Sequence, residues 1–149
     1  MAPRTVVVTG GGKGLGEFIS KAFYANGDQV VIASRGNSGL AASLGDRVCF
    51  AKCDVRVPSD LHYVAQIASE WTGRVDVWIN NAGYSAWNPV NKVEEVFWDE
   101  MLDTNLKGVF FGCQAAARVM QAGGCIVNIS SLAGKRGSAN NSVYCAAKF

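Results

Sequence analysis

The chain of 149 residues is long enough for one ordinary domain. Hydrophobic residues make up 49% of it and charged residues 17%, against a usual charged share of about 25%, which excludes an intrinsically disordered chain. The formal net charge of +2 is spread without a run of either sign, so the charge pattern does not indicate a nucleic-acid partner.

Five short apolar runs rich in Val and Ile predict β-strands at residues 5–8, 29–33, 48–52, 75–80 and 125–129. Longer segments of helical period separate these runs, an alternation typical of βαβ units in a parallel sheet. Residues 6–8 and 30–32 are continuously apolar, as expected for strands covered by helices on both faces. We therefore expect an α/β fold in a single domain over residues 1–149, with its parallel sheet buried on both sides.

Apolar stripes at helical spacing predict three helices between these strands. The first begins after Gly14 and ends at Asn26-Gly27, the second begins near Pro58, and the third ends at Gly123. The residues expected on their buried faces are Leu15, Ile19, Ala22 and Phe23 in the first helix, Leu61, Val64, Ile67 or Ala68, and Trp71 in the second, and Leu106, Val109, Phe110, Cys113, Ala117 and Met120 in the third. The residues Phe97, Trp98, Met101 and Phe111 are likewise expected to pack between helices.

A glycine-rich segment, TGGGKGLG at residues 9–16, connects the first strand to the first helix. Backbone amides at a helix N-terminus can hold an anionic phosphate, and glycine lets the main chain come close to it. The spacing matches neither GxGxxG nor the mononucleotide pattern GxxxxGK[ST]. Taken alone, the segment therefore predicts either a phosphate-binding loop or a tight turn without function.

Three further motifs follow in order. The fourth strand ends in Asn80-Asn81-Ala82-Gly83, the fifth run leads into Ser130-Ser131, and Tyr144 and Lys148 form a YxxxK motif thirteen residues after Ser131. Together with the TGxxxGxG loop, these motifs resemble the short-chain dehydrogenase/reductase family over essentially the whole chain. The resemblance implies a Rossmann-type doubly wound parallel sheet and a nicotinamide dinucleotide cofactor.

The YxxxK pair is suited to proton transfer. Reduction of a carbonyl by hydride produces an alkoxide, which needs a proton donor beside its oxygen. Lys148 lies one helical turn after Tyr144, so the two side chains share a face, and an ammonium close to a phenol favours the phenolate. The pair is therefore a candidate for proton exchange near neutral pH.

The resemblance implies four catalytic residues. Tyr144 would be the general acid or base, and Lys148 would tune it and contact the nicotinamide ribose. Ser131 would hydrogen-bond the substrate oxygen, while Ser130, the competing serine, should project the other way by strand alternation. Asn105 occupies the position of an asparagine that holds a water in the proton relay.

The residues after the second strand favour NADP(H) over NAD(H). Family members that prefer NAD place an acidic residue there, on the ribose 2'-hydroxyl. Here the sequence is Ala33-Ser34-Arg35, so no carboxylate repels a 2'-phosphate, and Arg35 and Lys13 supply two cations that could bind it. The residues expected to bind the cofactor are Gly10, Lys13, Gly14, Leu15, Gly16, Ser34, Arg35, Asp54, Val55, Asn81, Ala82, Gly83, Tyr144 and Lys148.

The sequence also constrains partners and location. His62 is the only histidine and has no companion at ligand spacing, so no metal is expected. The five cysteines form no CxxC pair, and no signal-like or membrane-spanning apolar stretch is present, which favours a cytoplasmic protein without a membrane partner. The helix over residues 106–121 corresponds to one that family members use for pairing, so a homo-oligomer is expected.

Two functions remain open from the sequence. The first is an NADPH-dependent oxidoreductase that interconverts a small-molecule ketone or aldehyde and an alcohol. The resemblance also implies strands beyond the YxxxK motif, so the domain is expected to be C-terminally incomplete and to need a complementary C-terminal segment. The second is a nucleotide-binding or interaction module that binds NADP(H) without turnover.

Overall fold

A computed structural model describes residues 3–149. Its five strands form one parallel sheet in the order β3-β2-β1-β4-β5. They are β1 (Thr5–Thr9), β2 (Gln29–Ser34), β3 (Val48–Lys52), β4 (Val77–Asn80) and β5 (Cys125–Asn128). The five predicted strands are therefore confirmed, with ends that differ by at most two residues.

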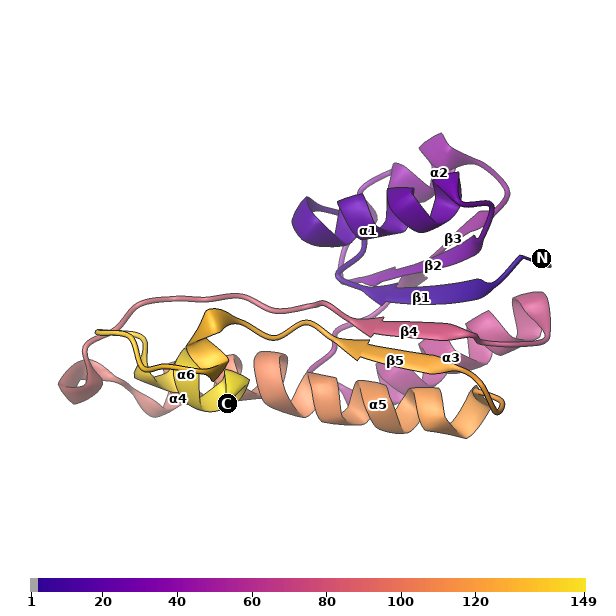
Figure 1. Ribbon diagram of the computed structural model, residues 1–149. Helices are drawn as coiled ribbons and strands as arrows, with labels where there is room; N and C mark the ends of the chain where they lie inside the picture. Colours follow the sequence, from indigo (N-terminus) through magenta and orange to yellow (C-terminus); the bar gives the residue numbers. More distant parts are fainter. Residues whose placement is uncertain (1–2) are drawn as a thin grey trace.

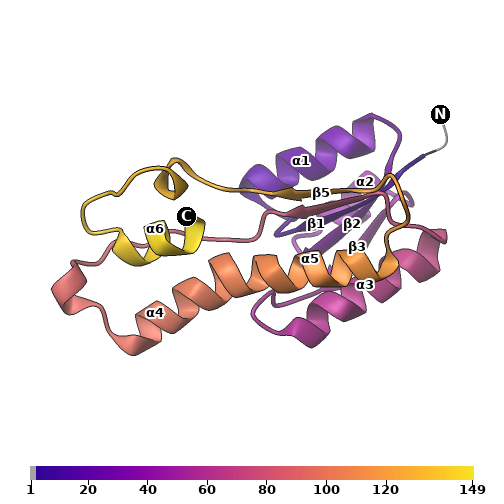
Figure 2. The ribbon, with the colours of Figure 1, turned by 60° about the horizontal axis from the view of Figure 1, so that its bottom comes forward.

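Helices cover both faces of the sheet (Figures 1 and 2). The covering helices are α1 (Gly14–Ala25), α2 (Leu40–Leu44), α3 (Pro58–Thr72) and α5 (Gly108–Val119). The other helical elements are α4 (Glu95–Leu102), α6 (Ser142–Lys148) and three short turns, η1 (Val90–Lys92), the π-helical η2 (Asp103–Lys107) and η3 (Leu132–Gly134). No helix within residues 3–149 is long and apolar enough to cross a membrane. The two faces and the reversal of strand order at β1 make this a doubly wound α/β fold, as expected.

Two hydrophobic cores lie on opposite faces of the sheet, because successive strand residues point to opposite sides. On one face Val7, Val31 and Trp78 pack with residues of α3 and α5. On the other face Val8 and Ile32 pack with residues of α1 and α2. The central strands are therefore buried on both sides, as their continuous apolar sequences predict.

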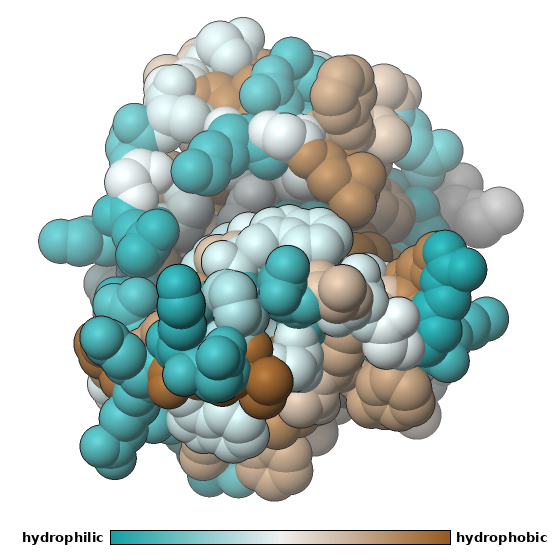
Figure 3. All heavy atoms as spheres, turned by 90° about the vertical axis from the view of Figure 1, so that its left-hand side faces the viewer, coloured by the Kyte–Doolittle hydropathy of each residue, from teal (hydrophilic) through white to brown (hydrophobic). Residues whose placement is uncertain are grey.

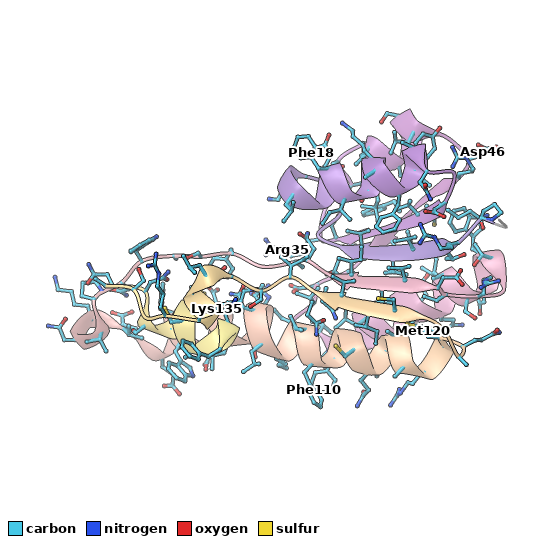
Figure 4. All side chains as sticks on the ribbon, in the orientation of Figure 1. Phe18, Arg35, Asp46, Phe110, Met120 and Lys135 are labelled. Carbon is cyan, nitrogen blue, oxygen red and sulfur yellow. The ribbon has the colours of Figure 1, made fainter. Side chains whose placement is uncertain are left out.

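The predicted buried face of the third helix is only partly confirmed, since Met120 packs against the core but Leu106, Phe110 and Ala117 are exposed. In α5 Leu106, just before the helix, and Phe110 are exposed, and the residues buried are Gly108, Gly112, Ala115 and Ala116. A Cβ atom on Gly108 would lie 3.0 Å from Val55 Cβ, and one on Gly112 would overlap the Asn80 side chain. At these positions the helix packs too closely on its neighbours to admit a side chain, so small residues form its buried stripe. Phe110 points away from the sheet (Figure 4), while Phe111, Val119 and the predicted Met120 pack against the core.

Two smaller corrections concern exposed residues. On α1 Leu15 and Ala22 are exposed, while Ile19 and Phe23 pack against the core as expected. On α4 Trp98 is exposed rather than packed between helices. α1 packs on β1 and β2 along one stripe of its surface, and α4 packs against η2 and α6, so each helix leaves its other side in solvent.

β5 forms one edge of the sheet and differs from the other strands. It pairs with β4, and all four of its residues are exposed, so the expectation of a sheet buried on both sides is wrong at this strand. Past the carboxyl ends of β4 and β5, α4, α6 and their loops project from the sheet (Figures 1 and 2). We call residues 83–106 and 130–149, which include α4 and α6, the projecting lobe. Seen from its end, hydrophobic and hydrophilic residues are mixed on the surface (Figure 3).

Candidate functional site

The carboxyl ends of β1 and β4 are joined at the point where the strand order reverses. Thr9 Oγ1 donates to the Ile79 carbonyl at 3.3 Å and accepts from the N–H groups of Asn81 and Ala82, each at 3.0 Å. Asn81 Nδ2 returns a bond to the Thr9 carbonyl at 2.9 Å. Ligands of open α/β sheets bind at such a switch point, outside the carboxyl ends of the strands, so this end of the sheet is the candidate site.

The glycine loop folds tightly at this end of the sheet. Gly10 has φ of +65°, which glycine adopts without strain, and its N–H donates to the Ala33 carbonyl at 2.7 Å. A Cβ atom on Gly16 would overlap the Gly10 carbonyl, whereas one on Gly14, with φ of +54°, would meet no atom within 4 Å. The loop is thus closed on the protein side and open at the N-terminus of α1, a shape that fits a bound phosphate group.

The end of β2 approaches this loop. A Cβ atom on Gly12 would lie 2.9 Å from Ser38 Oγ and 3.5 Å from Ser34 Oγ, so the loop and residues 34–38 are in close contact. Lys13, Arg35 and Ser38 are exposed around this contact, and Ser34 Oγ donates to the Gly36 carbonyl at 2.9 Å. Figure 4 shows Arg35 at the sheet edge nearest the projecting lobe. The two cations expected near a 2'-phosphate therefore lie on one exposed rim.

Past β3, Asp54 forms an ion pair that the sequence analysis missed. Arg56 Nη2 lies 2.6 Å from Asp54 Oδ2, and Arg56 Nε lies 3.0 and 3.1 Å from the two carboxylate oxygens. These hydrogen bonds hold the pKa of the Asp54 carboxyl below its usual value. Val55, between them, is buried against Gly108. The Asp-x-Arg spacing was the signal available in the sequence.

Asn105 lies in the π-helical turn η2, and its side chain is buried. Its Nδ2 donates to the carbonyls of Met101 and Tyr84, each at 3.0 Å, and its Oδ1 accepts from the Tyr84 N–H at 3.2 Å. A Cβ atom on Gly83 would lie 2.7 Å from Asn105 Oδ1 and 3.7 Å from Lys148 Nζ. Gly83 ends the segment Asn80-Asn81-Ala82-Gly83, the NNAG motif. Because Gly83 has no side chain, the end of this motif can lie between Asn105 and Lys148.

Lys148 and Tyr144 lie on the same face of α6, as the spacing predicts. Lys148 Nζ is 5.8 Å from the centroid of the Tyr144 ring and donates to the Ile129 carbonyl at 2.9 Å. Burial lowers the pKa of the Lys148 ammonium from its usual value, because the charged form loses solvent. The lysine is therefore a half-buried cation beside a phenol, at the end of β5.

The two serines after β5 make different contacts. Ser131 Oγ accepts from the Ala133 N–H at 3.2 Å and so caps the turn η3, while Ser130 Oγ donates to the Lys148 carbonyl at 3.4 Å. Turn η3 packs against α6, and a Cβ atom on Gly134 would overlap the Lys148 carbonyl. Both serines thus lie on the segment that joins β5 to the Tyr144 helix.

The sequence analysis also missed a polar network that joins the ends of β4 and β5. Trp78 Nε1 donates to Asn80 Oδ1 at 2.9 Å, and Asn80 Nδ2 donates to Asn128 Oδ1 at 2.8 Å. Asn80 and Asn128 are register partners, and Cys113 Sγ lies 3.4 Å from Asn80 Nδ2. Because β4 and β5 lead to the NNAG motif and to Ser131, the network fixes their ends relative to each other. The pairing of two asparagines on adjacent predicted strands was its signal.

The structure thus gathers most of the predicted site residues at the carboxyl ends of the strands. The glycine loop, residues 34–35, Asp54 and the NNAG motif surround the ends of β1 to β4, and Asn105, Ser131, Tyr144 and Lys148 lie on the side of β5 and the projecting lobe. His62 lies elsewhere, on α3, with Nε2 3.2 Å from Gln114 Oε1. Within residues 3–149 no cluster of His, Cys, Asp and Glu could hold a metal ion.

Comparison with known proteins gives consistent matches. A profile of the short chain dehydrogenase family matches residues 4–149. Galactitol 2-dehydrogenase of Agrobacterium fabrum is 34% identical over 152 residues, covering 97% of this chain and 59% of that protein. Sorbitol dehydrogenase of Cereibacter sphaeroides is 33% identical, with 97% and 59% covered. This chain therefore spans about three fifths of the length of these curated relatives.

A solved structure agrees with the sequence matches. It comes from Sinorhizobium meliloti 1021 and is described as a short-chain alcohol dehydrogenase. It superposes with a TM-score of 0.92 and 36% identity, covering 99% of this chain and 62% of that one. These matches confirm the resemblance read from the motifs and the Rossmann-type fold, and the chain belongs to the short-chain dehydrogenase family of oxidoreductases.

Proposed function

We propose that the protein is an NADP(H)-dependent oxidoreductase that interconverts a small-molecule ketone or aldehyde and the corresponding alcohol. Tyr144 serves as general acid in reduction and as general base in the reverse direction. The placement of Lys148 Nζ beside the Tyr144 ring, where Gly83 and Asn105 also converge, carries this proposal.

The dinucleotide fits the residues present. The glycine loop is closed toward the protein and open on its outer side. Backbone N–H groups at the start of α1 can bind a pyrophosphate there. Lys13 and Arg35 provide cations for a 2'-phosphate, and Ser34 and Ser38 provide hydroxyl groups beside them. When bound, the reduced nicotinamide supplies the hydride that the carbonyl carbon accepts.

The protein's own residues handle the oxygen and the proton. Ser131 hydrogen-bonds the substrate oxygen, and Tyr144 Oη transfers a proton to it as negative charge develops. The Lys148 ammonium, with Nζ 5.8 Å from the centroid of this ring, offsets the negative charge that remains on it. Asn105 holds a water that returns the proton from solvent, and its four side-chain hydrogen bonds keep its position fixed.

Removal of the phenol tests this assignment. Tyr144→Phe should reduce the rate of NADPH oxidation with a generic diketone by about 100-fold or more, because a positioned proton donor contributes about 10²–10⁴ in rate. Tyr63→Phe is the matched control, since Tyr63 is exposed on α3, and it should leave the rate unchanged. The measurement uses the protein alone and with any complementary segment that copurifies with it.

The outcomes separate the two functions. A Tyr144→Phe variant with an unchanged rate would contradict the role of Tyr144. A wild-type protein that binds NADPH tightly but transfers no hydride, even with the complementary segment present, would support the alternative of a binding module without turnover.

The proposed enzyme is a single Rossmann domain that needs a complementary C-terminal segment. The exposed edge of β5 supports this proposal, because unpaired strand edges are open to a further strand. Strong turnover by the 149-residue chain alone would contradict it.

Leu106 and Phe110 are exposed along η2 and α5, which supports a homo-oligomer paired through this face. All five cysteines, which lie within the described residues, are free thiols, which supports a cytoplasmic location.

A further inference from the structure

Arg56 makes contacts that orient it completely toward one carboxylate. In addition to the three guanidinium contacts with Asp54, its backbone N–H donates to Asp54 Oδ1 at 3.1 Å. The side chains of Arg56 and Asp54 are only partly exposed, at 35% and 23%. A partly buried pair with two parallel contacts has a more persistent geometry than an ordinary surface ion pair.

This ion pair lies next to the proposed 2'-phosphate site. The N–H of Cys53 donates to the Ser34 carbonyl at 3.0 Å, so Asp54 and Arg35 follow neighbouring strand ends. The fields of Arg56 and Arg35 both act on Asp54, and both lower the pKa of its carboxyl. Arg35 itself is exposed and takes part in none of the ion pairs formed by residues 3–149.

A carboxylate at this place has an electrostatic consequence. An acidic residue at the end of the second strand disfavours a phosphate on the ribose 2' position. Asp54 brings such a charge to the end of the adjacent strand, where it would both repel a phosphate dianion and attract Arg35. The described contacts show that Arg56 already neutralises this carboxylate.

We propose that Arg56 is a specificity-determining residue for a 2'-phosphorylated adenosine, because its pairing with Asp54 cancels the carboxylate charge and leaves Arg35 available for the phosphate. This inference rests on the proposed dinucleotide site. It assigns to Arg56 no contact with the ligand, and the discrimination arises from the charge that Arg56 removes.

Two adenosine ligands isolate the effect of one phosphate. Titration calorimetry would measure the affinities of adenosine 2',5'-bisphosphate and adenosine 5'-monophosphate. Arg56→Gln should weaken binding of the bisphosphate about fivefold more than binding of the monophosphate, which is the effect of one unit charge if it lies about 8 Å from a dianion in a water-like dielectric. Arg56→Lys keeps the charge and should keep most of the preference.

Two further variants distinguish charge from fold. The double variant Asp54→Asn with Arg56→Gln removes both charges and should restore the wild-type ratio of affinities. Arg74→Gln is the matched control, because Arg74 also pairs with an aspartate two residues away, Asp76. Asp76 directly precedes β4, at the amino ends of the strands and so away from the proposed site. The Arg74→Gln variant should leave both affinities unchanged.

The results separate this inference from the proposed function. If Arg56→Gln weakens both ligands equally, or if the double variant does not restore the ratio, Arg56 has only a structural role and the inference is wrong. If the wild-type protein binds neither ligand, the dinucleotide site itself is wrong.

Discussion

Strand β2 and the edge strand β5 differ in how well the surrounding helices cover them. Ile32 on β2 is 1% exposed and has helices on both sides of its strand, whereas Ile126 on β5 is 37% exposed. The glycine loop and residues 34–35 follow the well-buried strands. Tyr144 and Lys148 follow β5 on the short helix α6, whose Val143, Cys145 and Ala147 are buried. Lys148 Nζ also donates to the Ile129 carbonyl. The cofactor side is therefore built on the two cores of the sheet, while the proton-transfer side is held by the short buried face of α6 and by local hydrogen bonds.

The largest expected difference concerns two isoleucines. Ile32→Ala should lower the free energy of unfolding by about 3 kcal/mol, because it leaves a cavity in a closed core. Ile126→Ala should lower it by less than about 1 kcal/mol, since this side chain is already partly in water. Chemical denaturation of both variants measures the comparison, and equal losses would mean that β5 is as well packed as β2.

A smaller effect is expected from two aspartates, one in each region. Asp28, with its side chain 4% exposed, accepts from Arg4 Nε at 3.1 Å and from Arg4 Nη2 at 2.7 Å, whereas Asp103 forms an exposed helical pair with Lys107. Asp28→Asn should cost about 2 kcal/mol at pH 7, as expected for a buried hydrogen bond to a charged group. Asp103→Asn should cost less than about 0.5 kcal/mol.

The pH dependence of the Asp28 variant sharpens this prediction. Hydrogen bonds from Arg4 hold the pKa of the Asp28 carboxyl below its ordinary value of 3.8. The unfolded chain therefore binds the proton first, so the stabilisation is complete above this value and disappears as the pH falls through the lower folded pKa. The difference in unfolding free energy between wild type and Asp28→Asn should shrink in that acid range. A difference that does not change with pH would contradict the assignment.

The last comparison concerns a single turn within the projecting lobe. Asn140 has φ of +56°, and its carbonyl accepts from the Asn88 N–H at 2.7 Å, just before the Tyr144 helix. Asn140→Val should cost about 1 kcal/mol, because a β-branched residue is strained in this conformation, while Asn140→Gly should be close to neutral. Hydrogen exchange should be faster in α6 of the Val variant and unchanged in β1. Equal exchange in both variants would show that this turn does not hold the lobe.

The sequence predicted much of the fold and of the site for identifiable reasons. Continuous apolar runs placed the strands, since a parallel sheet covered on both faces leaves no polar position. Motif spacing predicted that Tyr144 and Lys148 lie one helical turn apart, and both lie on α6. The buried face of α5 was predicted only in part, because the close approach of Gly108 to Val55 and Gly112 to Asn80 depends on neighbours far away in the sequence.

By itself the sequence determined the alternation of strands and helices, the order of the motifs and the shared face of Tyr144 and Lys148, because each depends on local spacing along the chain. Only the tertiary structure decided that Asp54 is neutralised by Arg56 beside Arg35, that Asn80 and Asn128 join two strand ends, and that β5 is exposed. These features depend on which side chains meet across the sheet, and their strength is set by distance and burial, which no spacing in a single chain specifies.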